Sequence, residues 1–154
     1  MRIMFRLASV LILGLAPLFA AQAQTAAPAA EQELLAAVNR ARGAQGLAAL
    51  KWNEALAVAA HRHAALMAQH GAAAHGFPGE PALASRVTQA GAHFVWLSEN
   101  VIQGSSVETI HAEFLRSPNH RANILNPDYT HVGVGIAKGP DGMYYITQEF
   151  AQLR

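Results

Sequence analysis

The chain has 154 residues, 52% of them hydrophobic, and it contains no cysteine. It therefore folds without disulfide support, and thiol-based catalysis is excluded. Eleven basic and ten acidic residues nearly balance, so nothing in the charge favours nucleic acid as a partner.

The first residues predict a secretory signal peptide. Arg2 and Arg6 precede an uncharged apolar run from Leu7 to Ala20, and Ala21-Gln22-Ala23 gives the small-x-small pattern of a cleavage site. The run is short for a bilayer span, so we expect cleavage after Ala23 rather than anchoring. No membrane span should remain in the mature protein.

Cleavage would remove 23 residues and leave 131, a length that suits one domain. It would also remove two basic residues, which leaves nine basic against ten acidic residues. We expect residues 1–23 to be the signal peptide, residues 24–30 a flexible lead and residues 31–154 the folded domain. The protein should be exported to the periplasm or the medium, as a monomer.

The first half of this domain has the periodicity of amphipathic helices. A first helix is predicted from Glu31 to Arg42, because its apolar residues recur at three-and-four spacing before Gly43. A linker should follow at residues 47–52. Asn53 can cap a second helix that runs to about His70 and stops at Gly71. A glycine- and proline-rich loop at residues 71–81 then precedes one or two helical turns at residues 82–90.

The second half has the pattern of strands around one more helix. Residues 94–102 are rich in β-branched and aromatic side chains and predict a strand that ends at Gly104. Ser105 or Ser106 can cap a helix that reaches Arg116. Strands at residues 131–138 and 143–151 flank an Asp-Gly turn, which is typical of a hairpin. The expected class is α/β or α+β, in three layers, with a small mixed or antiparallel sheet between helices.

The most specific stretch is Ser117-Pro118-Asn119-His120-Arg121, followed by the loop and strand that carry Gly133-Val134-Gly135. Ser-Pro predicts a helix that begins with proline at its first position. His120 therefore lies in the first turn of a short helix, beside a buried strand. A polar side chain can be held rigidly at such a place.

Several motifs in chain order resemble the CAP superfamily of secreted proteins, which groups cysteine-rich secretory proteins, venom antigen five and plant pathogenesis-related proteins. They are His75, Arg86 with Gly91, Glu99-Asn100, Ser117 to Arg121, Gly133 to Gly135 and Gln148-Glu149-Phe150. The resemblance extends from about Leu34 to the C-terminus, and the lack of cysteine is similar to the bacterial branch. It implies a three-layer α-β-α sandwich with a central cleft, where in many members two histidines and two acids meet.

Carried over residue by residue, the resemblance places the first histidine at His75, the first acid at Glu99 and the second histidine at His120. The second acid has no counterpart. Its position, three residues after Phe114, is occupied by Ser117. The resemblance therefore implies a cleft with two imidazoles and one carboxylate.

Two interpretations of this set stay open. Two neutral imidazoles at His75 and His120 suit a weakly bound Zn²⁺ or another divalent cation, while Glu99 can ligate the ion or orient an imidazole. Alternatively, the three side chains hydrogen-bond one another and tie the loop to the sheet without a metal. For Ser117, a helix N-cap hydroxyl that accepts a backbone N–H is favoured over a nucleophile.

Three functions are compatible with the sequence. The resemblance favours a secreted, non-catalytic binding module whose cleft holds a divalent cation, with a lipid or peptide-like ligand nearby. The second is a metal-dependent hydrolase that uses His75 and His120, with Glu99 as the candidate general base. The third is a structural protein of the cell envelope that contacts cell-wall components. The H-E-x-x-H and G-x-S-x-G motifs of common zinc proteases and serine esterases are absent.

Overall fold

A computed structural model describes residues 28–154. The expected signal peptide, its cleavage site and residues 24–27 of the expected lead lie outside the described residues. The first helix begins at Ala29, two residues before the expected start of the folded domain at Glu31.

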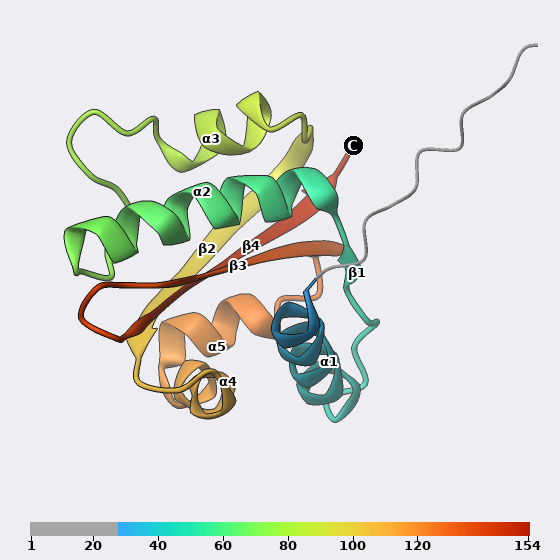
Figure 1. Ribbon diagram of the computed structural model, residues 1–154. Helices are drawn as coiled ribbons and strands as arrows, with labels where there is room; N and C mark the ends of the chain where they lie inside the picture. The colour runs from blue at the N-terminus through green and yellow to red at the C-terminus, as the bar shows by residue number, and fades with distance from the viewer. Residues whose placement is uncertain (1–27) are drawn as a thin grey trace, which may run out of the picture.

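The described chain forms three layers, with a four-stranded sheet between two groups of helices (Figure 1). The elements are α1 (Ala29–Gly43), β1 (Lys51–Trp52), α2 (Glu54–His70), α3 (Leu83–Gln89), β2 (Phe94–Gly104), α4 (Val107–Arg116), α5 (Pro118–Ile124), β3 (His131–Lys138) and β4 (Tyr144–Leu153). Helices α2 and α3 cover one face of the sheet, and α1, α4 and α5 cover the other. The predicted three-layer α-β-α arrangement is confirmed.

The sheet is mixed, in the order β1-β3-β4-β2. β1 runs parallel to β3, while β3 with β4 and β4 with β2 are antiparallel. Gly142, at φ 80°, closes the predicted turn between β3 and β4. Strand β2 lies at one edge of the sheet, and Glu99 on β2 stands directly opposite Glu149 on β4.

The predicted ends of α2 are confirmed in detail. The side chain of Asn53 accepts a hydrogen bond from the backbone N–H of Leu56 at 3.0 Å. Gly71 ends the helix in the left-handed conformation, at φ 66°, where a side chain would be strained. These two residues fix where the loop that carries His75 begins.

The predicted linker at residues 47–52 is wrong at its end. Lys51 and Trp52 form β1, and the N–H groups of Lys51 and Asn53 donate to the carbonyls of Thr130 and Val132, each at 3.0 Å. Two residues are too few to show a strand periodicity. Only their pairing with a strand 80 residues away makes them a strand.

The predicted serine caps are confirmed in position, whereas the predicted capping hydrogen bond at Ser117 is wrong. Ser106 and Ser117 hold the N-cap positions of α4 and α5, but neither side chain makes a capping hydrogen bond. The hydroxyl of Ser106 donates to the carboxylate of Glu108 instead. Ser117 ends α4 through its N–H and starts α5 through its carbonyl, which accepts from Arg121 at 2.9 Å. Its backbone therefore serves both helices, and the hydroxyl has no part in either cap.

The core differs between the two faces of the sheet. Toward α1, α4 and α5 lies a large apolar cluster, which includes Leu34, Val38, Ile110, Phe114, Ile124, Val132, Val134, Ile146 and Phe150. Toward α2 the packing is closer, because a Cβ on Gly135 would lie 2.3 Å from backbone atoms of Ala60 and His61. This close approach brings His63 of α2 against polar residues of the sheet.

Candidate functional site

His75 and Glu99, which are 24 residues apart in the sequence, are in contact. His75 lies in the loop after α2, and its Nδ1 is 2.9 Å from Oε1 of Glu99. The side chain of Glu99 is 2% exposed, whereas that of His75 is 66% exposed. An ionised carboxylate only accepts hydrogen bonds, so Nδ1 carries the proton and a neutral His75 has its lone pair on Nε2. The exposed ring can present that lone pair to a ligand.

Arg86 of α3 holds the other oxygen of Glu99. Its Nη2 donates to Oε2 of Glu99, and its Nη1 donates to the carbonyl of His75 at 3.2 Å. One buried guanidinium therefore ties the strand carboxylate to the backbone of the histidine loop. Charge-assisted bonds of this kind restrict both partners to one geometry.

His120 approaches from the opposite layer. Its carbonyl accepts a hydrogen bond from the side chain of Asn100 at 3.1 Å. Asn123, one turn further along α5, donates to Oδ1 of Asn100 at 2.8 Å and to the carbonyl of Glu99 at 3.4 Å. Thus the side chain of Glu99 contacts His75 on one face of β2. The side chain of the next residue, Asn100, bonds to the backbone of His120 on the other face.

The imidazole of His120 favours its neutral form. Burial lowers its pKa first, and the positive charge that His75 can carry lowers it further. The ring meets Phe114 edge-on at 5.2 Å between centroids, and its buried Nδ1 has no hydrogen-bond partner. Through this charge effect on the pKa of His120, the two imidazoles are coupled electrostatically.

Three further residues with buried side chains, His63, Glu80 and Glu149, extend this site, and none of them was predicted to have a role in it. His63 lies between two acceptors, with Nδ1 at 2.7 Å from Oε1 of Glu80 and Nε2 at 2.7 Å from the carbonyl of Ala74. Glu149 is fully buried, and neither of its carboxyl oxygens accepts a hydrogen bond from an N–H or hydroxyl donor. Burial first, and then the negative charge of Glu99, raise the pKa of Glu149 well above its ordinary value. A charged residue at an inward position of an apolar strand is the signal that could have identified Glu149.

Comparison with known proteins identifies the family of this domain. Residues 35–150 match the family model described as the cysteine-rich secretory protein family, CAP. The chain belongs to the CAP family. The predicted resemblance is confirmed, and the absence of cysteine is consistent with a bacterial, cysteine-free branch.

Two curated relatives come from Bacillus subtilis. The CAP chain is 32% identical over 121 residues to the uncharacterized membrane protein YlbC, covering 78% of this chain and 34% of YlbC. It is 29% identical over 117 residues to the uncharacterized protein YkwD, covering 75% of this chain and 46% of YkwD. The chain thus spans less than half the length of either relative.

Solved structures share the fold. An outer surface protein of Borrelia burgdorferi has a TM-score of 0.75 at 18% identity, covering 81% of this chain and 93% of that one. An extracellular protein of Bacillus anthracis that contains an SCP domain has a TM-score of 0.73 at 26% identity, covering 80% and 40%. These similarities support the CAP fold. In residues 28–154, no helix has the length and apolar character needed to cross a membrane.

The donor set of this CAP domain limits any metal site. Within residues 28–154, no group of three or more His, Cys, Asp or Glu side chains is arranged to hold a metal ion. The side chain of Glu99 is 2% exposed and accepts from His75 and Arg86, whereas that of His75 is 66% exposed, so the imidazole rather than the carboxylate is presented at the surface. Two imidazoles, on His75 and His120, remain as donors.

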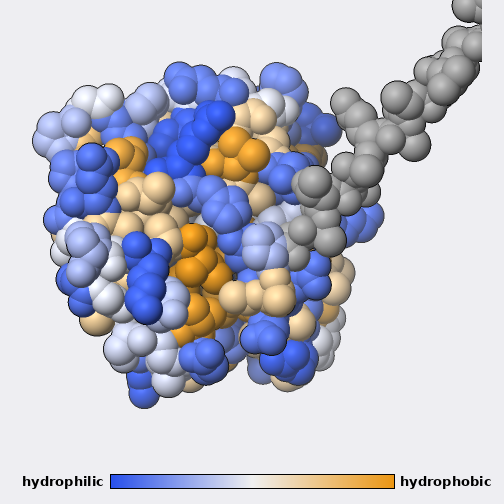
Figure 2. Space-filling view, viewed as in Figure 1, coloured by the Kyte–Doolittle hydropathy of each residue, from blue (hydrophilic) through white to orange (hydrophobic). Residues whose placement is uncertain are grey.

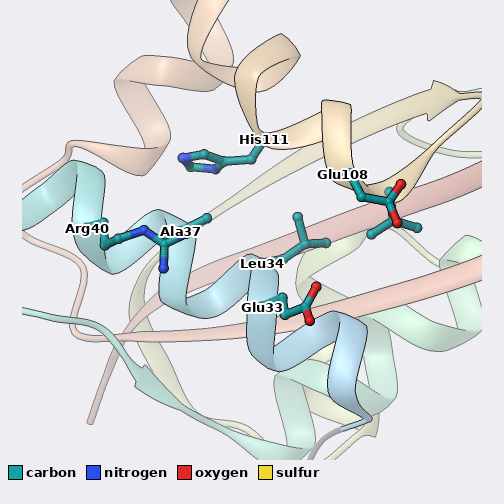
Figure 3. Close-up of a pocket in the computed structure, with 7 residues that line it drawn as sticks. Glu33, Leu34, Ala37, Arg40, Glu108 and His111 are labelled. Carbon is teal, nitrogen blue, oxygen red and sulfur yellow. The ribbon is translucent and has the colours of Figure 1, made fainter.

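A separate groove lies between α1 and α4, with a volume of about 210 Å³ (Figure 3). Leu34, Ala37 and Val107 give it an apolar lining. Arg40 and His111 lie toward one end, and Glu33 and Glu108 toward the other. Figure 2 shows hydrophobic surface exposed between these two helices. The groove has the combination of apolar and charged groups that small-ligand sites use.

Proposed function

We propose that this CAP-family protein is exported and acts as a non-catalytic binding module, with its ligand at His75, Glu99 and His120. The observation that carries the proposal is the engagement of Glu99. One oxygen faces Nδ1 of His75 and the other accepts from Arg86, and the side chain is 2% exposed. A general base needs a lone pair within reach of water. The burial of Glu99 at 2% exposure argues against its use as a general base, whereas the exposed His75 is free to bind, and this favours the binding module over the hydrolase.

A weakly bound divalent cation fits this donor set in part. His75 and His120 would hold it through neutral imidazole nitrogens, and the lowered pKa of His120 favours that form. A bound cation would supply a positive charge that attracts an anionic group of a ligand. With only two protein donors, we expect modest affinity.

Calorimetric titration with Zn²⁺ near neutral pH tests this site. Binding should be lost in the double variant His75→Ala with His120→Ala and should weaken at mildly acidic pH, because a protonated imidazole cannot ligate. His93→Ala removes an exposed histidine outside the site and should bind as the wild type does. Unchanged binding in the double variant would refute the site.

The groove between α1 and α4 is the proposed place for a lipid or peptide-like ligand. Its apolar lining suits the body of such a ligand, and Arg40 with His111 suits an anionic end. If Zn²⁺ binding is absent at both pH values, the histidines act as a structural tie. The groove then becomes the first place to look for a ligand.

Export is proposed from the N-terminal sequence, and from fold similarity to an extracellular and an outer-surface protein. The mature chain should begin near Gln24, after cleavage at Ala23. The intact mass of the protein recovered from the periplasm or the medium measures this directly. A recovered chain that retains Met1 would contradict the proposal.

A further inference from the structure

The carboxyl group of Glu149 is buried directly across the sheet from Glu99 and accepts no hydrogen bond from an N–H or hydroxyl donor. Its side-chain interaction with Glu99 is among the causes that raise its pKa. The nearest cation is Arg86, whose Nη2 is 3.8 Å from Oε1 of Glu149. That same nitrogen donates to Oε2 of Glu99. A third buried carboxyl group, that of Glu80, has its Oε1 3.4 Å from Nη1 of Arg86. One guanidinium therefore faces three buried carboxyl groups, and among them it donates a hydrogen bond only to Glu99.

The charge balance of the buried network leaves one proton for the carboxyl groups of Glu99 and Glu149. The carbonyl of Ala74 only accepts, so Nε2 of His63 carries a proton. A second proton lies between Nδ1 of His63 and Oε1 of Glu80, 2.7 Å apart. Whichever of the two holds it, His63 and Glu80 together are neutral. Arg86 then balances one negative charge, not two.

Hydrogen bonding decides which carboxyl group is ionised. Glu99 faces donors on both oxygens, Nδ1–H of His75 and the guanidinium of Arg86. Donors stabilise a carboxylate, whereas a buried carboxylate without donors is strongly disfavoured. Glu99 is therefore the anion and Glu149 the neutral acid. The raised pKa of Glu149, caused first by burial and then by the charge of Glu99, agrees with this assignment.

We propose that Glu149 is a positioning residue for the histidine site: as a neutral carboxylic acid it donates its hydroxyl proton to Glu99 and so fixes the carboxylate that orients His75. Glu99 then has three donors, from His75, Arg86 and Glu149, and cannot rotate. The imidazole of His75 is held with the proton on Nδ1 and the lone pair of Nε2 directed away from the carboxylate. This inference deepens the proposed function, since it explains how an exposed histidine keeps one binding geometry.

Infrared spectroscopy of the purified protein at neutral pH tests the protonation of Glu149. A protonated carboxylic acid has a C=O stretch separate from the carboxylate bands. The wild type should show this band, and Glu149→Gln, which replaces the neutral acid by a group of similar shape, should lose the part that belongs to Glu149. A proton on Glu80 would add its own absorption, which stays in Glu149→Gln and is removed by Glu80→Gln. A wild type without the band, or a band of undiminished intensity in Glu149→Gln, would overturn the assignment.

Nitrogen-15 NMR of the histidine rings tests the positioning role without any metal or ligand. His75 should be the Nδ1–H tautomer in the wild type and in Glu149→Gln, whose amide can still donate to Glu99. Glu149→Leu and Glu149→Met remove the donor, and a folded sample of either should show a mixture of tautomers. Glu99→Leu is the control for complete loss of orientation.

A wild-type tautomer in Glu149→Leu or Glu149→Met would overturn the positioning role, because Glu149 would then only occupy space. If neither apolar variant folds, Glu149→Gln decides, since a tautomer change in that variant contradicts the proposal. The infrared and NMR spectra are recorded on the protein without added metal or ligand. A failure of Zn²⁺ binding would reject the cation proposal and leave the assignment of Glu149 intact.

Discussion

The two faces of the sheet are stabilised by different means. Strand β4 shows the contrast within one element, because Ile146 and Phe150 join the large apolar cluster on the side of α1, α4 and α5. On the side of α2, the same strand contributes Glu149, which joins a buried group of charged residues with Glu99 and Arg86. The face toward α1, α4 and α5 holds one large apolar cluster, whereas the face toward α2 holds two smaller apolar clusters together with this charged network.

The buried charges on the α2 face lower the stability that this face could otherwise provide. Burying paired charges is often neutral or unfavourable relative to apolar packing, so the charged network on the α2 face is a poor source of stability. Residues that break a local packing rule tend to occur at functional sites. Here they lie directly beneath the exposed His75. The apolar clusters on both faces supply the stability, and the buried charges on the α2 face position His75.

The largest expected effect is on the face toward α1, α4 and α5, at Val134. This side chain is fully buried within the main cluster. Val134→Asp would bury a carboxylate without a partner, at a cost of several kcal/mol, on the order of a small domain's whole stability. Lys138→Asp places the same side chain at an exposed position of the same strand and should have little effect. A thermal melt of Val134→Asp within a few degrees of the wild type would show that this face is not the main core.

The next effect is on the α2 face, at Arg86. Arg86→Met keeps much of the volume but leaves the carboxylate of Glu99 without its cation, and breaking a buried ion pair in this way costs about 3–5 kcal/mol. Adding Glu99→Gln should recover part of that loss, because the uncompensated charge is then absent. Urea denaturation of the single and double variants measures both the stability lost in Arg86→Met and the part recovered by Glu99→Gln. A double variant no more stable than Arg86→Met would mean that charge pairing is not what Arg86 contributes.

Most of the fold could be predicted from local patterns. Asn53 and Gly71 bound α2 because capping and left-handed turns depend on residues that are adjacent in sequence. β1 could not be predicted, since only its pairing with β3 defines it. The predicted capping hydrogen bond of Ser117 was wrong because its backbone ends one helix and starts another.

The site was predictable only through family resemblance. That resemblance pointed to His75, Glu99 and His120, and the structure joins His75 to Glu99 by a hydrogen bond. Glu149 belongs to the motifs that carry the resemblance, but the resemblance gave it no role in the site, and His63 belongs to none of these motifs. Their importance depends on charge balance among residues from α2, α3, β2 and β4, which no local pattern encodes.

The smallest expected effect concerns the contact between the two helical layers. His61 of α2 lies 3.1 Å from Glu31 of α1, through Nε2 and Oε1, and its side chain is 41% exposed. The hydrogen bond to Glu31 raises the pKa of His61 above its ordinary value, with the charges of Glu31 and Glu54 adding to it and burial opposing it. Glu31 is nearly buried, so the pair is partly shielded from solvent.

The sign of the pH dependence follows from the raised pKa. A group that binds its proton more tightly when folded stabilises the protein fully below its unfolded pKa, about 6.5 for histidine. That contribution is lost as the pH rises through the folded pKa of His61. The wild type should therefore exceed His61→Gln in stability at about pH 6 and match it more closely at about pH 8.5. Because His61 is half exposed, we expect a difference of only about 0.3–1 kcal/mol, and less at high salt.

Urea denaturation at the two pH values measures this difference, with Arg62→Gln as the control on the exposed neighbouring position. Glu31→Gln should remove the same pH dependence, because it removes the carboxylate that holds the proton on His61. A difference between the wild type and His61→Gln that is constant from pH 6 to pH 8.5 would show that the pair contributes packing rather than charge. In that case the two layers would be joined by apolar contacts alone along α1, and protonation would leave the stability of the fold unchanged.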